Sequence, residues 1–383
     1  MFLKNKSDFY DMVKLTTIEI NGTRKGKRYQ QQMEVMFMSH LDSFLNGIYD
    51  SLQNKRDDQL DAPWEQKRAY LIEHLIPALG EFELPEGEAA DFRPVLLESV
   101  ELDEVIRERI EITTLGGLRM PVYIVKPKNM QHGEQKPAVV LWHGHGYGSR
   151  SLVGLMEDGS PKLETGKLSD NIALELARRG LVVMAPEVAG FGDRRLQRDR
   201  IQDPELKNSC YNLSAALFMT GKTTAGLRVY EALRAAEYLS TLEYVDANRI
   251  GNMGHSGGGT IASLSAALDP RVKASVVGIY PNTYRGSILA VRHCLCNYIP
   301  GIMLHAEMPD LLGLIAPKPL FIEAGIDDPI FPVATTREAI QALEQIYGEL
   351  GISTKFDSHI FEGKHEISGV RSFDWMMNTL HAL

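Results

Sequence analysis

The chain has 383 residues, which is enough for a sizeable hydrophobic core in one or two domains. Hydrophobic residues make up 44% of it and charged residues 24%, the balance of an ordinary globular protein. The formal net charge of −9 at pH 7 argues against a protein dedicated to nucleic acids or to anionic membrane surfaces. We therefore expect neither nucleic acid nor a membrane among its partners.

The lack of a recognisable targeting segment and the small number of cysteines lead us to expect a cytoplasmic protein. The N-terminus lacks the apolar segment of a secretory signal, and no stretch approaches the roughly 18 to 20 apolar residues of a membrane span. Cys210, Cys294 and Cys296 are too few for a disulfide framework. His293 with the last two cysteines could be a fragment of a metal site, but no second pair of ligands follows at zinc spacing. We expect free thiols and no metal.

Residues 1–105 are predicted to form a mostly helical N-terminal extension that packs on the following domain. Apolar residues recur at helical spacing between residues 33 and 52. A second helix is predicted to begin at Asp61, its N-cap, and to end before Gly80.

From residue 106 onwards, predicted strands alternate with predicted helices. The expected strands are 109–114, 120–126, 138–142, 181–185, 249–253, 274–279, 320–324 and 354–361, and the expected helices are 171–179, 227–242, 260–267, 336–350 and 372–383. Such alternation means βαβ units, which require a largely parallel sheet with helices on both faces. Residues 106–383 are therefore predicted to be an α/β catalytic domain.

The strongest local signal is Gly254-His255-Ser256-Gly257-Gly258, which matches G-x-S-x-G between a predicted strand and a predicted helix. A serine on such a turn stands at a helix N-terminus, where N–H groups and partial positive charge would stabilise an oxyanion. The glycines let strand and helix approach each other without side-chain clashes. We predict that Ser256 is a nucleophile, and the alternative is a glycine-rich turn that is only structural.

A serine hydroxyl needs a base, and the base needs an acid that orients it. Asp327 and Asp328 follow the end of a predicted strand, at the edge of the sheet that also carries the serine. We choose Asp328 as the acid and expect Asp327 to cap the turn. His365 lies in the loop after the next strand, and we predict that it is the base that takes the Ser256 proton.

A second glycine-rich segment, 143–146, directly follows the predicted strand 138–142. The backbone N–H of His145 is our candidate for an oxyanion hole, together with that of Gly257. The imidazoles of His143 and His145 are expected to hold the loop or line the pocket rather than to bind metal. The spacing differs from that of a phosphate-binding loop, so we expect no cofactor.

The segment 281–316 is long for a connection between strands and is expected to wall the substrate pocket. The candidate lining residues, for each of which core packing is an equal alternative, are Tyr284, Tyr298, Ile299 and Met303. The sequence leaves open whether the chain forms a homo-oligomer.

Six segments complete the pattern: His-Gly-His-Gly at 143–146, Gly-Phe-Gly-Asp-Arg-Arg at 190–195, Gly-His-Ser-Gly-Gly-Gly at 254–259, Cys-Asn-Tyr-Ile-Pro-Gly at 296–301, Asp-Asp-Pro-Ile-Phe-Pro at 327–332 and Gly-Lys-His at 363–365. Together they resemble the α/β-hydrolase superfamily and, within it, the dienelactone-hydrolase-like branch of bacterial acetyl xylan esterase-like proteins. The resemblance covers residues 106–383. It implies a serine esterase that cleaves short-chain, acetyl-type esters through an acyl-enzyme.

The chain departs from the family pattern at two points. Dienelactone hydrolases use a cysteine nucleophile where this chain has Ser256, which favours ester hydrolysis over lactone chemistry. Secreted xylan deacetylases carry a signal peptide, and the N-terminus of this sequence does not resemble one. A small acetylated sugar or another short-chain ester inside the cell is therefore the expected substrate.

Two other functions are compatible with this pattern. A serine peptidase of the prolyl-oligopeptidase type would share the fold and the serine turn, but 105 helical residues cannot form the β-propeller that such enzymes usually carry. A non-catalytic binding module could use the same scaffold. The presence of Ser256, Asp328 and His365 argues against that module.

Overall fold

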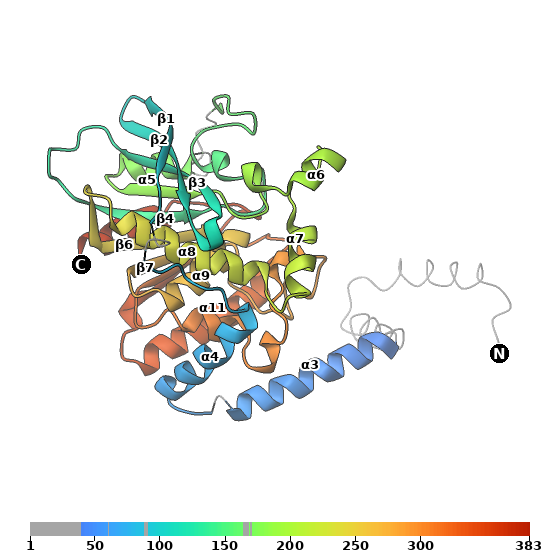
Figure 1. Cartoon of the computed structure of the whole chain (residues 1–383). Helices are drawn as coiled ribbons and strands as arrows, with labels where there is room; N and C mark the ends of the chain where they lie inside the picture. The colour runs from blue at the N-terminus through green and yellow to red at the C-terminus, as the bar shows by residue number, and fades with distance from the viewer. Residues whose placement is uncertain (1–39, 60, 88–90, 164–167, 169–170) are drawn as a thin grey trace, which may run out of the picture. The chain divides into compact units, whose positions relative to one another are not determined.

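The computed structural model describes residues 40–59, 61–87, 91–163, 168 and 171–383. The chain divides into two compact units, residues 1–59 and 60–383 (Figure 1). The first unit contributes helix α3 (His40–Gln59). The helix predicted between residues 33 and 52 lies partly outside the described residues, and α3 continues past its predicted end.

The second unit is built on a single sheet, with strand order β1-β2-β3-β5-β4-β6-β7-β8-β9 among the described residues. The strands are β1 (Val95–Glu101), β2 (Val105–Thr113), β3 (Arg119–Pro127), β4 (Lys136–Trp142), β5 (Val182–Pro186), β6 (Val245–His255), β7 (Val272–Gly278), β8 (Leu320–Gly325) and β9 (Phe356–Phe361). From β5 to β9 neighbouring strands are parallel, whereas β1, β2 and β3 pair antiparallel at one edge and β3 joins β5 antiparallel.

The helices of this unit are α4 (Trp64–Leu79), α5 (Ile172–Arg178), α6 (Gln197–Gln202), α7 (Cys210–Phe218), α8 (Thr224–Ser240), α9 (Gly257–Leu268), α10 (Met308–Gly313), α11 (Val333–Glu349) and α12 (Ser372–His381). No helix in the described part of the chain is long and apolar enough to cross a membrane.

Helices cover both faces of the sheet. Alternate residues of a strand point to opposite faces, so one strand contributes apolar side chains to the core on each side. On β4, Val139 and Leu141 belong to the same core cluster as α5 and α12. Ala138 and Val140 belong instead to the cluster that includes α8 and α9, which lie side by side in Figure 1. The mostly parallel α/β sheet expected from the sequence is confirmed.

The second unit begins earlier than the predicted boundary between residues 105 and 106. Leu71, Leu75 and Leu79 of α4 are buried in the same cluster as residues of α9 and α11. The end of α4 also contacts α8 closely: a Cβ on Gly226 would lie 2.1 Å from the carbonyl oxygen of Leu79. In addition, β1 extends the sheet, so the segment predicted to be helical also supplies a strand.

Strand β8 carries a buried carboxyl group, that of Glu323, with 0% of the residue exposed. Its Oε1 accepts a hydrogen bond from the Gly369 N–H at 3.0 Å, and its Oε2 lies 3.1 Å from the Ser372 hydroxyl, which donates to it. Burial disfavours the charged form and raises the pKa of Glu323 to about 7. The folded state therefore holds a proton that the unfolded chain releases near its ordinary value of 4.5.

This difference predicts a loss of stability as the pH rises. The contribution of Glu323 is fully present below about pH 4.5, declines as the pH rises and is lost above about pH 7. In Glu323→Gln, which keeps the hydrogen bonds without a titrating group, this decline should disappear. Between pH 5 and 8 we expect the free energy of unfolding of the wild type to fall by up to roughly 3 kcal/mol relative to the variant.

Urea unfolding at several pH values measures this difference. The matched control is Glu344→Gln, which changes an exposed glutamate on α11 and should follow the wild type. The prediction would be contradicted if the free energy of unfolding changed with pH in the same way in the wild type and in Glu323→Gln.

Candidate active site

Ser256 stands on a sharp turn between the end of β6 and the start of α9. Its φ of 54° lies in the left-handed region, which few residues other than glycine adopt. Two neighbouring glycines allow the turn to pack: a Cβ on Gly254 would lie 2.2 Å from the Gly258 carbonyl oxygen, and one on Gly258 would lie 2.3 Å from that of Trp142. The turn therefore presents Ser256 at the carboxyl edge of the sheet and at the N-terminus of α9.

The three residues predicted to carry the chemistry lie in one hydrogen-bonded chain. His365 Nε2 is 2.9 Å from Ser256 Oγ, and His365 Nδ1 is 2.7 Å from Asp328 Oδ2. The other oxygen of Asp328 accepts hydrogen bonds from the backbone N–H groups of Ile330 at 2.8 Å and Phe331 at 3.0 Å. An ionised Asp328 can only accept, so Nδ1 carries the ring proton and Nε2 is free to accept the serine proton.

Asp327 does not cap the turn before Pro329 as expected. It is exposed, and its backbone N–H donates to the Gly363 carbonyl at 2.9 Å. The turn is capped instead by Asp328, because a carboxylate has two oxygens and this one uses Oδ1 for the turn and Oδ2 for His365. The sequence prediction that Asp327 caps the turn was wrong.

The two predicted oxyanion donors come from adjacent segments. A Cβ placed on Gly257 would lie 2.8 Å from Cε1 and Nδ1 of His145, so this imidazole lies against the residue after the serine. Within the described part of the chain, neither backbone N–H donates to a protein acceptor. His255 holds the same loop, since its Nε2 accepts from the Gly144 N–H at 3.2 Å. Burial lowers the pKa of His255 to about 3, so its ring stays neutral and can accept.

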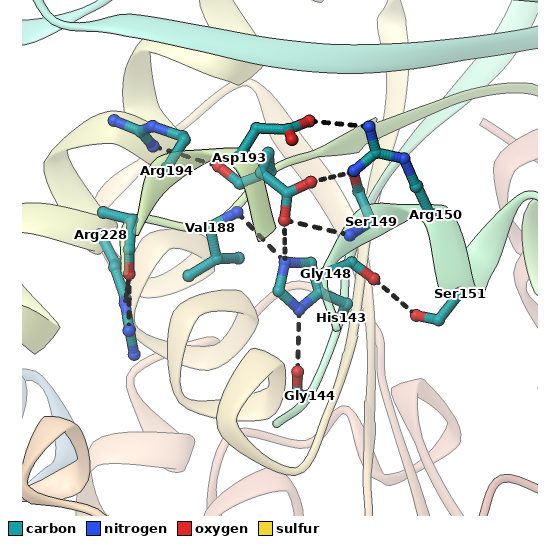
Figure 2. A network of polar contacts seen from close by, with 12 residues as sticks. His143, Gly144, Gly148, Ser149, Arg150, Ser151, Val188, Asp193, Arg194 and Arg228 are labelled. Atoms are coloured by element: carbon teal, nitrogen blue, oxygen red, sulfur yellow. Dashed lines mark hydrogen bonds and ion pairs between the residues drawn. The ribbon is translucent and has the colours of Figure 1, made fainter. Parts of the chain in front are cut away.

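His143 also holds this loop (Figure 2). Its Nδ1 donates to the Gly144 carbonyl at 2.8 Å, and its Nε2 accepts from the Val188 N–H at 3.1 Å. The buried carboxylate of Glu187 continues the network by accepting from the N–H and hydroxyl of Ser149, at 3.2 and 2.8 Å. His143 is 2% exposed, so of the two roles expected for its side chain the structure supports holding the loop.

A cavity of about 670 Å³ opens beside Ser256 and His365. Its apolar wall includes Ile172, Phe331 and Ile367. The ring of Phe331 is stacked on that of His365, with centroids 5.7 Å apart.

The segment 281–316 lines this cavity as expected, but through its residues 291–294 and 297. The four lining residues predicted in this segment, Tyr284, Tyr298, Ile299 and Met303, are not among those that line it, and neither is His143, whereas His145 is. Tyr284 and Ile299 are buried in the core cluster beneath α9 and α11, and Tyr298 and Met303 pack against that cluster. The prediction that these four residues line the pocket was wrong, and the alternative of core packing is confirmed, because their side chains face the core.

Three cysteines and a histidine gather next to the cavity. His145 Nε2 and the Sγ atoms of Cys210, Cys294 and Cys296 all lie within 4.8 Å of one another. His293, the histidine considered from the sequence, is not part of this cluster. We expected no metal because no second ligand pair follows at zinc spacing, but the fold brings two further candidate ligand atoms to Cys294 and Cys296 from distant segments.

Comparisons with known proteins agree with this architecture. Residues 165–353 match the dienelactone hydrolase family, a segment that includes Ser256 and Asp328 and ends before His365. YtaP of Bacillus subtilis (strain 168), described as a hydrolase, is 29% identical over 275 residues, which are 69% of this chain and 85% of that protein.

Solved structures show the same fold. One is a Bacteroides fragilis protein described as an acetyl xylan esterase, with a TM-score of 0.64 and 16% identity over 85% of this chain and 83% of that one. Another is a glucuronoyl esterase from Solibacter usitatus, with a TM-score of 0.58 and 15% identity over 83% and 91% of the two chains. At these identities the likeness establishes the fold.

Proposed function

We propose that this chain, whose residues 165–353 match the dienelactone hydrolase family, is a hydrolase that cleaves short-chain carboxylic esters with Ser256 as its nucleophile. The observation that carries the proposal is the chain of hydrogen bonds of 2.9 and 2.7 Å that joins Ser256, His365 and Asp328 beside an open cavity. The geometry matches what nucleophilic serine catalysis needs: a base within reach of the hydroxyl, and an acid that fixes the base.

The reaction has two halves. In the first, His365 Nε2 takes the Ser256 proton as Oγ attacks the ester carbonyl, and the backbone N–H groups of Gly257 and His145 stabilise the oxyanion that forms. The tetrahedral intermediate then collapses, the bond to the alcohol oxygen breaks, and His365 returns the proton to the leaving alcohol. The products of this half are the alcohol and an acyl-serine.

In the second half, a water molecule attacks the acyl-serine and gives one proton to His365. Collapse of the second tetrahedral intermediate breaks the bond to Ser256 Oγ, which recovers that proton. The products are the carboxylic acid and the free enzyme, and Asp328 stabilises the imidazolium in both halves.

Two observations support carboxylic esters as substrates, and the second favours an acetyl group. Phe331 stacks on His365 and, with Ile172 and Ile367, gives the cavity an apolar wall beside the serine. The similar solved structures are described as esterases, and one of them is described as an acetyl xylan esterase. We therefore place acetylated small molecules first among the substrates of this chain.

Hydrolysis of p-nitrophenyl esters from acetate to octanoate by the wild-type chain tests the proposal. We expect kcat/KM to be highest for acetate and to fall by at least about tenfold by octanoate, because each methylene that fits a pocket poorly costs about 1 kcal/mol or more. Faster cleavage of a prolyl p-nitroanilide than of any ester would favour a peptidase instead. No hydrolysis of any ester would contradict the proposal.

A further inference from the structure

We propose that His145, Cys210, Cys294 and Cys296 bind one Zn²⁺ ion in a closed tetrahedral site beside the active-site cavity. The proposal goes beyond ester hydrolysis and does not depend on it.

The positions of the four ligand atoms fit a single ion. Zn–S bonds of about 2.3 Å and Zn–N bonds of about 2.0 Å place tetrahedral ligand atoms roughly 3.4 to 3.8 Å from one another. Here His145 Nε2 is 3.2 Å from Cys296 Sγ, which is 3.2 Å from Cys294 Sγ, and all four atoms lie within 4.8 Å of one another. An iron–sulfur cluster would hold its ligands farther apart. Thiolate and imidazole are the ligands that structural zinc sites use.

The charge around the cluster also favours a metal. Arg228 is 4% exposed, and its Nη2 donates to Cys210 Sγ at 3.2 Å. Its other acceptor is the Ala189 carbonyl oxygen, at 2.7 Å from Nη2 and 3.1 Å from Nε. In the described part of the chain, the hydrogen-bond acceptors of Arg228 are this carbonyl oxygen and the Cys210 sulfur, and neither is a carboxylate. A buried guanidinium without an anion is costly.

Zinc with three thiolates resolves this imbalance. Three thiolates and one Zn²⁺ carry a net charge of −1, which the single positive charge of Arg228 neutralises. On binding, zinc would displace the protons of the three thiols, because a metal of this kind is held by thiolates.

The site would fix the wall of the cavity rather than take part in the reaction. Its ligands come from the loop after β4 (His145), the first turn of α7 (Cys210) and the segment 281–316 (Cys294 and Cys296). Because the protein supplies all four ligands, no position is open for substrate or water, as in structural zinc sites. The ion would tie the loop that presents the His145 N–H to the segment that lines the cavity.

Metal analysis of the full-length wild-type protein, purified under reducing conditions from zinc-supplemented medium, tests the proposal. We expect elemental mass spectrometry to find about one zinc ion per chain. After replacement of zinc by Co²⁺, we expect thiolate-to-cobalt charge transfer and the visible bands of a tetrahedral ion. Metal at trace level, with free thiols or a disulfide between Cys294 and Cys296 in the intact mass, would overturn the proposal.

Two variants locate the ion. Cys210→Ser should lose the zinc and the charge-transfer band, whereas His293→Asn, which changes the nearby histidine outside the cluster, should keep both. Chelation of the wild-type ion should lower Tm by at least about 5 °C, because binding to the folded state alone stabilises it. Equal zinc content in both variants would place the metal elsewhere and overturn the assignment. If Cys210→Ser does not fold, the cobalt spectrum of the wild type still decides.

Discussion

Replacement of Ser256 by alanine is expected to lower kcat for p-nitrophenyl acetate by at least about 10³-fold, while the protein stays folded. The loss is large because the serine, His365 and Asp328 act as one unit, so the rest of the unit has little to activate once Oγ is gone. Oxyanion stabilisation and substrate binding should leave a residual rate above that of water.

The control for this variant is a second serine near the same turn. Ser263 is buried on α9, where its hydroxyl donates to the Thr260 carbonyl, and Ser263→Ala should keep the rate within about threefold. A fluorophosphonate probe should add its mass to the wild type and to Ser263→Ala but not to Ser256→Ala. Thermal unfolding shows whether each protein is folded. A Ser256→Ala protein that retains the wild-type rate would remove this serine as the nucleophile.

Replacement of Asp328 by asparagine should lower kcat by roughly 10³- to 10⁴-fold. An asparagine can keep its oxygen towards the N–H groups of Ile330 and Phe331, so the turn should survive. Its NH₂ group would then face His365 Nδ1 and donate to it. The ring proton would move to Nε2, which could no longer accept the proton of Ser256.

The neighbouring residue offers a matched control, because Asp327→Asn makes the same chemical change at an exposed carboxylate. That variant should stay within about threefold of the wild type. The measurement is kcat for p-nitrophenyl acetate across a range of pH, with unfolding curves for both variants. A greater loss of activity in Asp327→Asn than in Asp328→Asn would show that the acid had been misassigned.

His145 has a role in both the zinc site and the ester hydrolysis that we propose. Its backbone N–H is a proposed oxyanion donor, and its ring nitrogen is a proposed zinc ligand. If both hold, removal of the ion should affect the oxyanion loop as well as the stability of the fold. The two proposals remain separable, since metal content and cobalt spectra do not depend on activity.

Local pattern determined most of the catalytic domain. Every strand and helix predicted after residue 106 is present with its ends shifted by a few residues, because the period of buried apolar residues reports which face of an element packs. The order serine, aspartate, histidine, each after a strand, was also visible, since the carboxyl ends of parallel strands meet at one edge of a sheet. The hydrogen bonds of Ser256 and Asp328 with His365 follow from that placement.

Only the tertiary structure decided the features that depend on contacts between distant segments. Local spacing carries no signal for three of them: the burial of α4 beside α9 and α11, the addition of β1 to the sheet and the burial of Tyr284 in the core. The cluster of His145 with Cys210 and Cys296 is the clearest case, because its members are far apart in the sequence. Sequence periodicity records how an element meets its neighbours, but not which neighbours it meets. The choice of partners is made when the whole chain packs, since burial of apolar surface depends on total area rather than on sequence order.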